Sequence, residues 1–275
     1  METSTWLDKE PPYRGNAWVE TLEPRKQEEA NFHDADREGH QNETDRESGN
    51  RHWYAATLPI VDYMESRIAA NAKGKTVLDY ACGSGGMTQR FAKHGASIAL
   101  GIDISETSVR NAAENAERQG VTHTRFLQRD CESTGLPDNT FDTILCSGML
   151  HHLDLTRAYP ELHRILKPGG RVLCFEALNY NPLIKLYRKL TPQYRTAWEA
   201  KHILSMKEVR YARQWFKVEN VKFFFMASPL ATLLPKGAVR DTGITIGHAV
   251  DALLTRVPLL RFWSWQFAFE LVKGY

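Results

Sequence analysis

The run from Val77 to Gly86 (VLDYACGSGG) constrains the fold of this 275-residue chain more than any other feature. Its first four residues are apolar apart from Asp79 and predict a short buried strand. Three glycines follow, and a helix is expected to begin near Met87. A strand, a glycine turn and a helix N-terminus together build ligand sites in α/β proteins. The run therefore predicts such a site at its glycines.

Strands and helices alternate along the chain after this run. Strands are expected at Thr76–Tyr80, Ser97–Ile102, Thr124–Gln128, Phe141–Cys146 and Arg171–Glu176, and helices at Gly86–His94, Ser105–Gln119 and Leu155–Leu166. Ser105 is the expected N-cap of the second helix, and Lys167-Pro168-Gly169-Gly170 is expected to stop the third. Further on, Ser205 with Glu208 three residues later predicts a capping box at the start of a helix over Ser205–Phe216. This repetition predicts a parallel sheet with helices on both faces. In such a sheet the ligand lies beyond the carboxyl ends of the strands, where the strand order reverses.

Outside this alternation the composition changes, which divides the chain into four parts. We expect an N-terminal arm or lid (1–50), with a polar helix at Pro24–Glu38, then the ligand-binding core (51–178), a substrate cap segment (179–217), and closing strands (218–275) with a helical insertion (229–257). Residues 1–50 could form either a solvated arm or a lid over the ligand site, and the sequence leaves both possibilities open.

The C-terminal aromatic residues alternate with small or polar ones. Trp263, Trp265, Phe267, Phe269 and Leu271 share this period of two, which predicts a strand with one buried face. The surrounding apolar stretch, 257–272, is too short to span a membrane and contains Arg261, Gln266 and Glu270.

Composition narrows the class of protein and its compartment. The net charge of +2 gives no reason to expect a nucleic-acid partner. The four cysteines, Cys82, Cys131, Cys146 and Cys174, form no CxxC pair and have no histidines at metal-ligand spacing, so we expect buried free thiols and no metal site. Free thiols fit the cytoplasm, and the polar first residues show no signal peptide.

Two cofactor classes use a glycine turn of this kind. A nicotinamide dinucleotide requires G-x-G-x-x-G, but Thr88 stands where the third glycine belongs. Asp103, 20 residues beyond Gly83, fits a carboxylate that binds a ribose diol, which both cofactors carry.

Several stretches in order resemble the class I S-adenosylmethionine-dependent methyltransferases. They are the run around Asp79, then GIDIS at 101–105, QRD at 128–130, LPDNTFD at 136–142, MLHHL at 149–153 and LKPGGR at 166–171. The resemblance implies S-adenosyl-L-methionine as cofactor and S-adenosyl-L-homocysteine as product. It also implies a doubly wound, mostly parallel, seven-stranded Rossmann-like α/β sheet with an antiparallel last strand, to which the N-terminal helical lid and the insertion cap are added.

The resemblance also assigns cofactor contacts. Asp79 would serve the amino or sulfonium region, Asp103 the ribose, and Asp130 the adenine amino group, with Ile104 and Cys131 walling the ring. Gly83 and Gly85 would admit the methionine portion, and Ala81, Cys146 and Ser147 would complete the site. Taken singly, Asp79 or Asp130 could instead be a turn or cap residue.

The acceptor is expected to be a small organic molecule with an apolar or aromatic part. The Asn/Asp-Pro-Pro-aromatic motif of adenine and glutamine methyltransferases is missing after the fourth strand, and paired glutamates of arginine methyltransferases are not visible. Aromatic and apolar residues of the cap would enclose the acceptor, or else form the cap's own core: Tyr180, Leu183, Tyr187, Tyr194, Trp198, Trp215, Phe223–Phe225 and Leu230–Leu234.

A proton acceptor for the reaction is sought among histidines near the cofactor. His151 is the first candidate and His152 the second, since both follow the fourth strand, although they could merely bound the pocket or cap a helix. Weaker candidates are Glu176, His33, Tyr54 and His202.

Two other functions stay open. The chain could be a regulatory or assembly subunit that binds the cofactor without catalysis. It could also be a peripheral membrane enzyme acting on a lipid quinone, because Trp263 and Trp265 could face a membrane. Membrane association is not the favoured reading. The acceptor atom and the oligomeric state are not predicted.

Overall fold

A computed structural model describes residues 6–39 and 55–275. Trp53, Tyr54 and the end of the predicted arm, 40–50, lie outside this part. Seven strands form one sheet in the order β3-β2-β1-β4-β5-β7-β6. Their bounds are β1 Thr76–Tyr80, β2 Ile98–Asp103, β3 Thr124–Gln128, β4 Phe141–Ser147, β5 Leu166–Ala177, β6 Lys217–Phe224 and β7 Gln266–Val272. The first five strands pair in parallel and β7 is antiparallel to both neighbours, as predicted.

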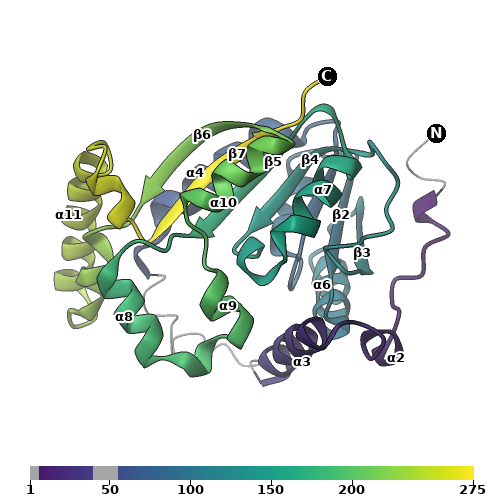
Figure 1. Cartoon of the computed structure of the whole chain (residues 1–275), viewed down its shortest axis with the longest axis horizontal. Helices are drawn as coiled ribbons and strands as arrows, with labels where there is room; N and C mark the ends of the chain where they lie inside the picture. The colour runs from purple at the N-terminus through teal and green to yellow at the C-terminus, as the bar shows by residue number, and fades with distance from the viewer. Residues whose placement is uncertain (1–5, 40–54) are drawn as a thin grey trace.

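Helices cover both faces of the sheet (Figure 1). One apolar cluster joins the sheet to α4 (Leu58–Ala72) and α5 (Gly86–Lys93). The opposite cluster joins it to α7 (Leu155–Ile165) and α10 (Met206–Tyr211). The helix α6 (Glu106–Arg118) begins at the predicted N-cap, Ser105, whose hydroxyl accepts a hydrogen bond from the Ser108 amide.

The order of the strands reverses between β1 and β4, which fixes where a ligand site can form. β2 follows β1 on one side, whereas β4 and β5 lie on the other. The loops after β1 and β4 therefore diverge and leave a crevice between them. The glycine turn at 83–86 and the histidine pair at 151–152 lie on these two loops.

Two predictions about strands are wrong. The strand β5 begins at Leu166, which pairs with Phe141 across a register shift, so the Pro168-Gly169-Gly170 segment lies inside the strand and not in a helix stop before it. The strand β7 is buried on both faces because it lies between β5 and β6. Phe267, Phe269 and Leu271 pack on one side and Ala268 on the other.

Glu270 is a charged residue in the buried strand β7, and two arginines compensate for its burial. It is buried in β7, and its carboxylate pairs with Arg67 at 2.7 Å and with Arg171. Trp263 lies before the strand, in the 3₁₀ turn η7 (Leu260–Trp263), so the strand begins later than the predicted alternation.

The C-terminal half adds helices around one end of the sheet. They are α8 (Pro182–Leu190), α9 (Ala197–His202), the 3₁₀ segment η6 (Ser228–Leu233) and α11 (Ala238–Leu254). The predicted capping box at the start of α10 is present between Ser205 and Glu208. Figure 1 shows α8, α9 and α3 along the lower edge and α11 at the left.

The described part of the N-terminal segment packs on this core. It contains α2 (Asn16–Val19) and α3 (Pro24–Gly39), the predicted polar helix. The Gln128 amide donates to the Pro12 carbonyl at 2.8 Å, and the Gln128 side chain accepts from the amides of Arg14 and Gly15. The segment thus continues along the edge strand β3 before α3 crosses the carboxyl ends of the strands.

Candidate functional site

Two adjoining cavities occupy the crevice between β1 and β4. The smaller has a volume of about 180 Å³ and the larger about 730 Å³. His33, Ser147, Gly148 and His152 line both. The two spaces therefore share one wall, and a ligand in one can be reached from the other.

The smaller cavity collects most of the predicted cofactor residues. Those that line it are Ala81, Gly83, Asp103, Ile104, Asp130, Cys131 and Ser147. They come from the ends of four strands, which the topology brings to one point. Asp79, Gly85 and Cys146 are not among the lining residues.

Asp103 holds the glycine loop in place. One carboxylate oxygen accepts from the Gly83 amide at 2.9 Å, and the other accepts from the Ser105 amide at 2.9 Å. Gly83 has a positive φ of 51°, which a glycine adopts at low cost. The carboxylate thus lies at the end of β2 with spare lone pairs for a diol.

Gly85 is required for packing rather than for ligand approach. A Cβ at this position would lie 2.8 Å from the Ala112 methyl and from the Phe126 ring, and its φ is +77°. The neighbouring helix and strand therefore account for this glycine. Cys146 likewise belongs to the core beside Cys174, and all four cysteines are buried and free, as predicted.

Asp79 caps helix α5 from behind the glycine loop. Its Oδ2 accepts from the Thr88 amide at 2.9 Å and from the Thr88 hydroxyl at 2.7 Å. Full burial raises the pKa of Asp79 to about 6, against the lowering effect of the Thr88 hydrogen bonds. The side chain bounds the site electrostatically but does not face the cavity.

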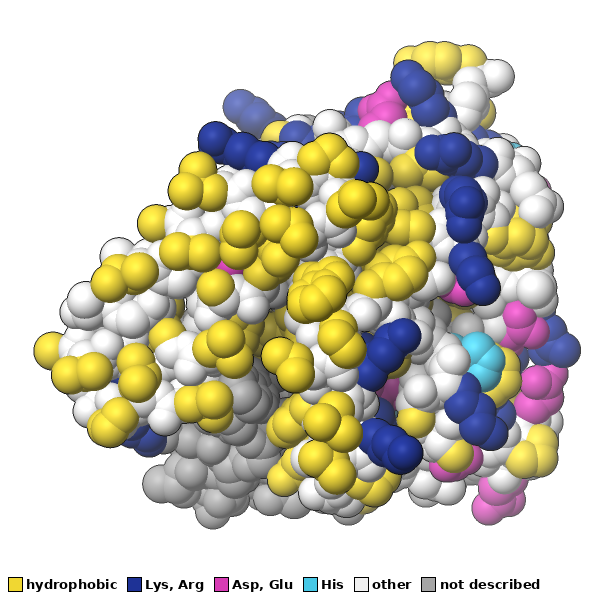
Figure 2. Space-filling view, turned by 60° about the vertical axis from the view of Figure 1, so that its left-hand side comes forward, with side chains coloured by type: hydrophobic (Ala, Val, Ile, Leu, Met, Phe, Trp, Pro, Cys, Tyr) yellow, Lys and Arg dark blue, Asp and Glu magenta, His cyan; other side chains and the backbone are white. Residues whose placement is uncertain are grey.

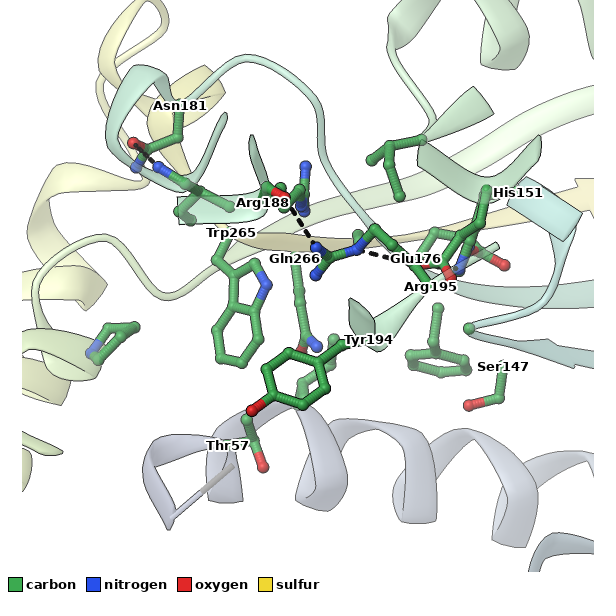
Figure 3. Close-up of a pocket in the computed structure, with 18 of the residues that line it drawn as sticks. Thr57, Ser147, His151, Glu176, Asn181, Arg188, Tyr194, Arg195, Trp265 and Gln266 are labelled. Carbon is green, nitrogen blue, oxygen red and sulfur yellow. Dashed lines mark hydrogen bonds and ion pairs between the residues drawn. The ribbon is translucent and has the colours of Figure 1, made fainter. Parts of the chain in front are cut away.

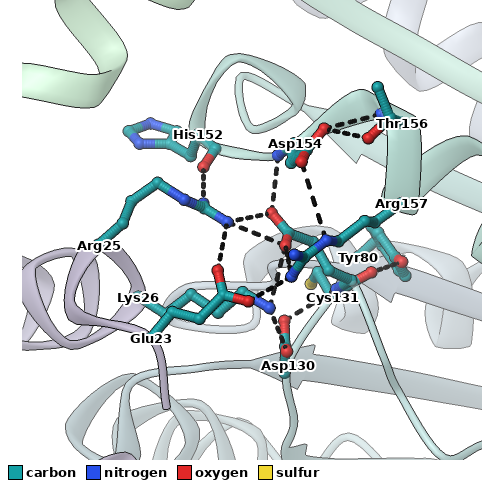
Figure 4. A network of polar contacts seen from close by, with 11 residues as sticks. Glu23, Arg25, Lys26, Tyr80, Asp130, Cys131, His152, Asp154, Thr156 and Arg157 are labelled. Atoms are coloured by element: carbon teal, nitrogen blue, oxygen red, sulfur yellow. Dashed lines mark hydrogen bonds and ion pairs between the residues drawn. The ribbon is translucent and has the colours of Figure 1, made fainter.

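Helix α3 lies along the smaller cavity, and a network of ion pairs joins it to the loop after β3 (Figure 4). Lys26 Nζ lies 2.7 Å from Asp130 and 2.9 Å from the buried carboxylate of Glu132. Arg25 donates two hydrogen bonds to Glu132, at 2.7 and 2.9 Å, and its guanidinium lies over the Trp198 ring of α9. The predicted adenine partner Asp130 is therefore also tied to α3.

Three residues of α3, Arg25, Lys26 and Glu29, are site residues that were not predicted, whereas His33 was predicted only as a weaker proton acceptor. Arg25, Lys26, Glu29 and His33 all line the smaller cavity. Their spacing is helical, so the charged face they form could have been read from the sequence as a face directed at a polar site.

His151 and Glu176 form a buried pair on the wall of the larger cavity. The His151 Nδ1 lies 2.7 Å from Glu176 Oε2. The other oxygen of Glu176 accepts from the amides of Met149 and Leu150, at 2.9 and 2.8 Å, which fixes the carboxylate. His151 Nε2 is left 3.8 Å from Glu199. The carboxylate therefore orients the imidazole, whose second nitrogen is free of close hydrogen bonds among the described residues.

His152 forms a second pair, with Glu29 of α3. Their Nδ1 and Oε2 atoms lie 2.9 Å apart, and His33 lies 3.6 Å from the same carboxylate. Burial alone would lower the pKa of His152, but the hydrogen bond and charge of Glu29 raise it overall. His152 is therefore more readily protonated than an ordinary histidine and a poorer proton acceptor at neutral pH.

The ligand atoms of Glu29, His33 and His152 lie within 4.8 Å of one another, a spacing that could hold a metal ion. Glu29 is already hydrogen-bonded to Thr196 as well as to His152. Glu29, His33 and His152 therefore act as a polar link between α3, the loop after β4 and the start of α9.

The larger cavity has an apolar body with a few polar groups (Figure 3). Its apolar lining includes Ile60, Val61 and Met64 of α4, Met87, Phe175, Ile184, Ile203, Met226 and Trp265. The polar groups include Asn181, Tyr194, Arg195 and Glu199. In Figure 3 the rings of Tyr194 and Trp265, which both line the cavity, lie above α4.

The predicted cap residues divide between the cavity and the cap's own packing. Leu183, Tyr187, Tyr194 and Leu230 line the larger cavity. Trp198 instead stacks on His202, with ring centroids 3.8 Å apart, and Trp215 packs against Tyr159 and Tyr211. His202 and the remaining cap candidates are not among the residues that line either cavity. Trp265 faces the larger cavity, not a membrane.

Comparison with known proteins identifies the core. Residues 78–174 match the family model described as a methyltransferase domain. A ubiquinone biosynthesis O-methyltransferase of Coxiella burnetii is 35% identical over 133 residues, which cover 48% of this chain and 55% of that protein. A ubiquinone/menaquinone biosynthesis C-methyltransferase of Escherichia coli is 35% identical over 122 residues, 42% of this chain and 48% of that protein. The chain thus spans about half the length of these relatives.

Solved structures support the fold over a longer range. The geranyl diphosphate C-methyltransferase of Streptomyces coelicolor superposes with a TM-score of 0.62 at 16% identity, covering 92% of this chain and 99% of that one. The magnesium protoporphyrin IX methyltransferase of Synechocystis gives 0.60 at 16% identity, covering 90% and 100%. At these identities the likeness concerns the fold alone. Among the helices of the described chain, none is both long and apolar enough to cross a bilayer.

Proposed function

Because its core belongs to the class I S-adenosylmethionine-dependent methyltransferases, we propose that this protein transfers a methyl group from S-adenosyl-L-methionine to a small organic acceptor with a large apolar part. The observation that carries the proposal is the wall shared by the two cavities. Ser147, Gly148 and His152 line both, so donor and acceptor would meet there. Such a meeting point suits an in-line displacement, for which alignment supplies much of the rate.

The smaller cavity is the proposed cofactor site. Asp103 would accept the ribose hydroxyls, and Asp130, flanked by Ile104 and Cys131, would receive the adenine. Bound there, S-adenosylmethionine supplies an electrophilic methyl on a sulfonium, and S-adenosylhomocysteine remains as the product. The volume of about 180 Å³ lies below the roughly 300 Å³ usual for ligand sites, so α3 would have to shift to admit the cofactor.

The larger cavity is the proposed acceptor site. Its apolar lining favours an organic body, and its volume of about 730 Å³ suits an acceptor well above the size of a simple metabolite. Arg195 and Tyr194 would bind a polar head group of that acceptor. This combination disfavours small, highly charged acceptors.

His151 is the proposed general base. Glu176 orients its ring, and Nε2 would take the proton of an acceptor hydroxyl as the oxygen attacks the methyl carbon. The raised pKa of His152 makes that residue the weaker candidate. The presence of an oriented base, His151, also argues against the alternative that the protein is a subunit that binds the cofactor without catalysing a reaction.

A lipid-soluble phenol or quinol is the acceptor class that fits best. Two observations favour it: the apolar cavity, and the names of the relatives, which act in quinone biosynthesis. Free buried cysteines support a location in the reducing cytoplasm.

The test is transfer of labelled methyl to a panel of acceptors. Purified protein is incubated with methyl-labelled S-adenosylmethionine and with phenols that differ only in the length of their alkyl chain. We expect turnover to rise with chain length. A preference for the phenol without an alkyl chain, or no S-adenosylhomocysteine with any acceptor, would refute the proposal.

A further inference from the structure

Helix α11 has its apolar face turned outward. Val239, Ile246, Val250 and Leu253 are spaced seven, four and three residues apart, which places them on one side of a helix, and all four are exposed. Ile246 is 59% and Leu253 65% exposed. A helix on the surface of a water-soluble protein normally shows the opposite arrangement.

The inner face of α11 is polar or small and is firmly attached. Asp251 accepts from the amides of Met226 and Ala227, at 3.0 and 2.6 Å, and from the hydroxyl of Ser228 at 2.6 Å. His248 donates to the Ala56 carbonyl at 2.8 Å. Gly247 lies so close to Ser228 that a Cβ would come within 2.6 Å of its Cα. The orientation is therefore specified by the contacts and not by loose packing.

Helix α8 repeats this arrangement, and its N-cap Asn181 donates to the carbonyl of Trp263, in the turn after α11, at 2.6 Å. Leu183, Leu186 and Leu190 are spaced three and four residues apart and are all exposed, and the helix has no buried residue. Further exposed side chains come from the adjoining turns: Leu230, Leu233, Leu234, Val257, Leu259, Leu260 and Trp263. We call these α8, α11 and turn residues the apolar face. Figure 2 shows their hydrophobic side chains spread over the side of the molecule that carries α11.

The apolar face is also basic. The segments 182–190 and 228–263 contain seven Lys or Arg and two Asp, a net charge of +5 in a chain whose total is +2. One of the two acids, Asp251, is buried in the hydrogen bonds just described. The combination of outward apolar stripes, basic residues and an interfacial tryptophan is typical of surfaces that lie on anionic bilayers.

The apolar face adjoins the larger cavity. Leu183 and Leu230 are exposed on this face and also line the cavity, as do their neighbours Ile184 of α8 and Pro229 of η6. An acceptor dissolved in a bilayer would meet this side of the cavity first.

We propose that the apolar face docks the protein on an anionic membrane surface, with α8 and α11 lying in the headgroup region and the larger cavity facing the lipid. Docking itself does not depend on methyl transfer. Delivery of the acceptor from the bilayer rests on the proposed function.

The experiment is flotation of the full-length protein with vesicles, without S-adenosylmethionine. Vesicles of phosphatidylcholine alone are compared with vesicles containing about a third phosphatidylglycerol. We expect binding to the anionic vesicles that weakens at high salt, because the basic residues are screened. The variant Ile246→Glu/Leu253→Glu should bind roughly 30-fold more weakly or worse.

A matched control keeps the result specific. Val221→Glu places one apolar-to-glutamate substitution, against two in the α11 variant, on β6, at a residue that is 37% exposed and outside the apolar face. It should bind as the wild type does. Affinity for S-adenosylhomocysteine, measured on all three proteins, verifies folding. Equal binding by the wild type and the α11 variant would overturn the proposal. So would a wild-type dimer that ignores vesicles and dissociates in the α11 variant, because a second copy would then cover the face.

The two proposals fail separately. A protein that methylates a detergent-dispersed phenol but never floats with vesicles retains the proposed function and loses the docking surface. A protein that floats but forms no S-adenosylhomocysteine does the reverse.

Discussion

The imidazole of His151 and the carboxylate of Glu176 are held 2.7 Å apart on the wall of the larger cavity. Glu176 comes from the end of β5, and His151 from the loop after β4. Two backbone amides bind the carboxylate oxygen that His151 does not use, so the pair has one arrangement. This geometry assigns different roles to the two residues: His151 would exchange the proton, and Glu176 would position it.

Replacing His151 tests the first role. His151→Gln should lower kcat by about 10²–10⁴-fold and change the KM for S-adenosylmethionine little, because the side chain faces the acceptor cavity. His163→Gln, on α7 and not among the cavity-lining residues, is the control and should retain wild-type kinetics. A His151→Gln enzyme with full turnover at saturating acceptor would remove His151 as the base.

Glu176→Gln tests the positioning role by separating kcat from KM. The amide preserves the shape of the side chain but has only one acceptor oxygen, so it cannot hold both His151 and the amides of Met149 and Leu150 as the carboxylate does. We expect kcat to fall by about tenfold or more, with little change in the KM for S-adenosylmethionine. A wild-type kcat, or a loss confined to the KM for S-adenosylmethionine, would show that Glu176 does not position the base.

Asp103→Asn tests the cofactor site. The substitution removes a carboxylate that would accept the ribose hydroxyls, and we expect S-adenosylhomocysteine to bind roughly 10- to 100-fold more weakly by calorimetry. Asp62→Asn, on the exposed side of α4, is the matched control. Equal affinities for the two variants would place the ribose elsewhere.

Lys26→Met tests the tie between α3 and the core. The substitution leaves Asp130 and Glu132 buried without this cation, so the protein should melt several degrees lower. With α3 loosened, S-adenosylhomocysteine should dissociate faster, by about tenfold in stopped-flow fluorescence. Lys93→Met, which loses one exposed hydrogen bond to Gln119, should do neither. Unaltered dissociation in Lys26→Met would mean that α3 does not control access to the smaller cavity.

The buried carboxylate of Asp79 should leave a signature in the pH dependence of stability. Its pKa is about 6 in the folded protein and 3.8 when unperturbed, so between these values the folded state binds more protons than the unfolded state. Ionisation of Asp79 therefore lowers the free energy of unfolding as the pH rises, by up to about 3 kcal/mol above pH 6.

Urea unfolding of wild type and Asp79→Asn isolates this contribution. The difference in free energy of unfolding should shift in favour of the variant as pH rises from 4 to 6, and then level off. A difference that is constant over this range would show that Asp79 has an ordinary pKa.

The sequence was most informative where a residue's role is local. The strand–turn–helix run, the cap at Ser105 and the capping box at Ser205 each depend on neighbours within a few residues, and the structure confirms all of them as elements. The doubly wound, mostly parallel sheet with an antiparallel last strand was implied by the family resemblance, and the structure confirms it.

Long-range packing explains what the sequence did not reveal. Gly85 is fixed by Phe126 from another strand, and the burial of β7 on both faces depends on β6 pairing beyond it. The contacts of Lys26 with Asp130 join residues 104 positions apart, which no local pattern records. The outward apolar stripe of α11 is visible as a periodicity, but the side that it faces is decided by the contacts of Asp251 with the segment after β6.

A crystal structure of the protein with S-adenosylhomocysteine tests the central claim most directly. The account predicts the ribose hydroxyls on Asp103, the adenine beside Asp130 and Ile104, and the sulfur next to Ser147 and Gly148 with its open side toward the larger cavity and His151. A product molecule bound outside the smaller cavity, or a sulfur turned away from the larger one, would contradict it.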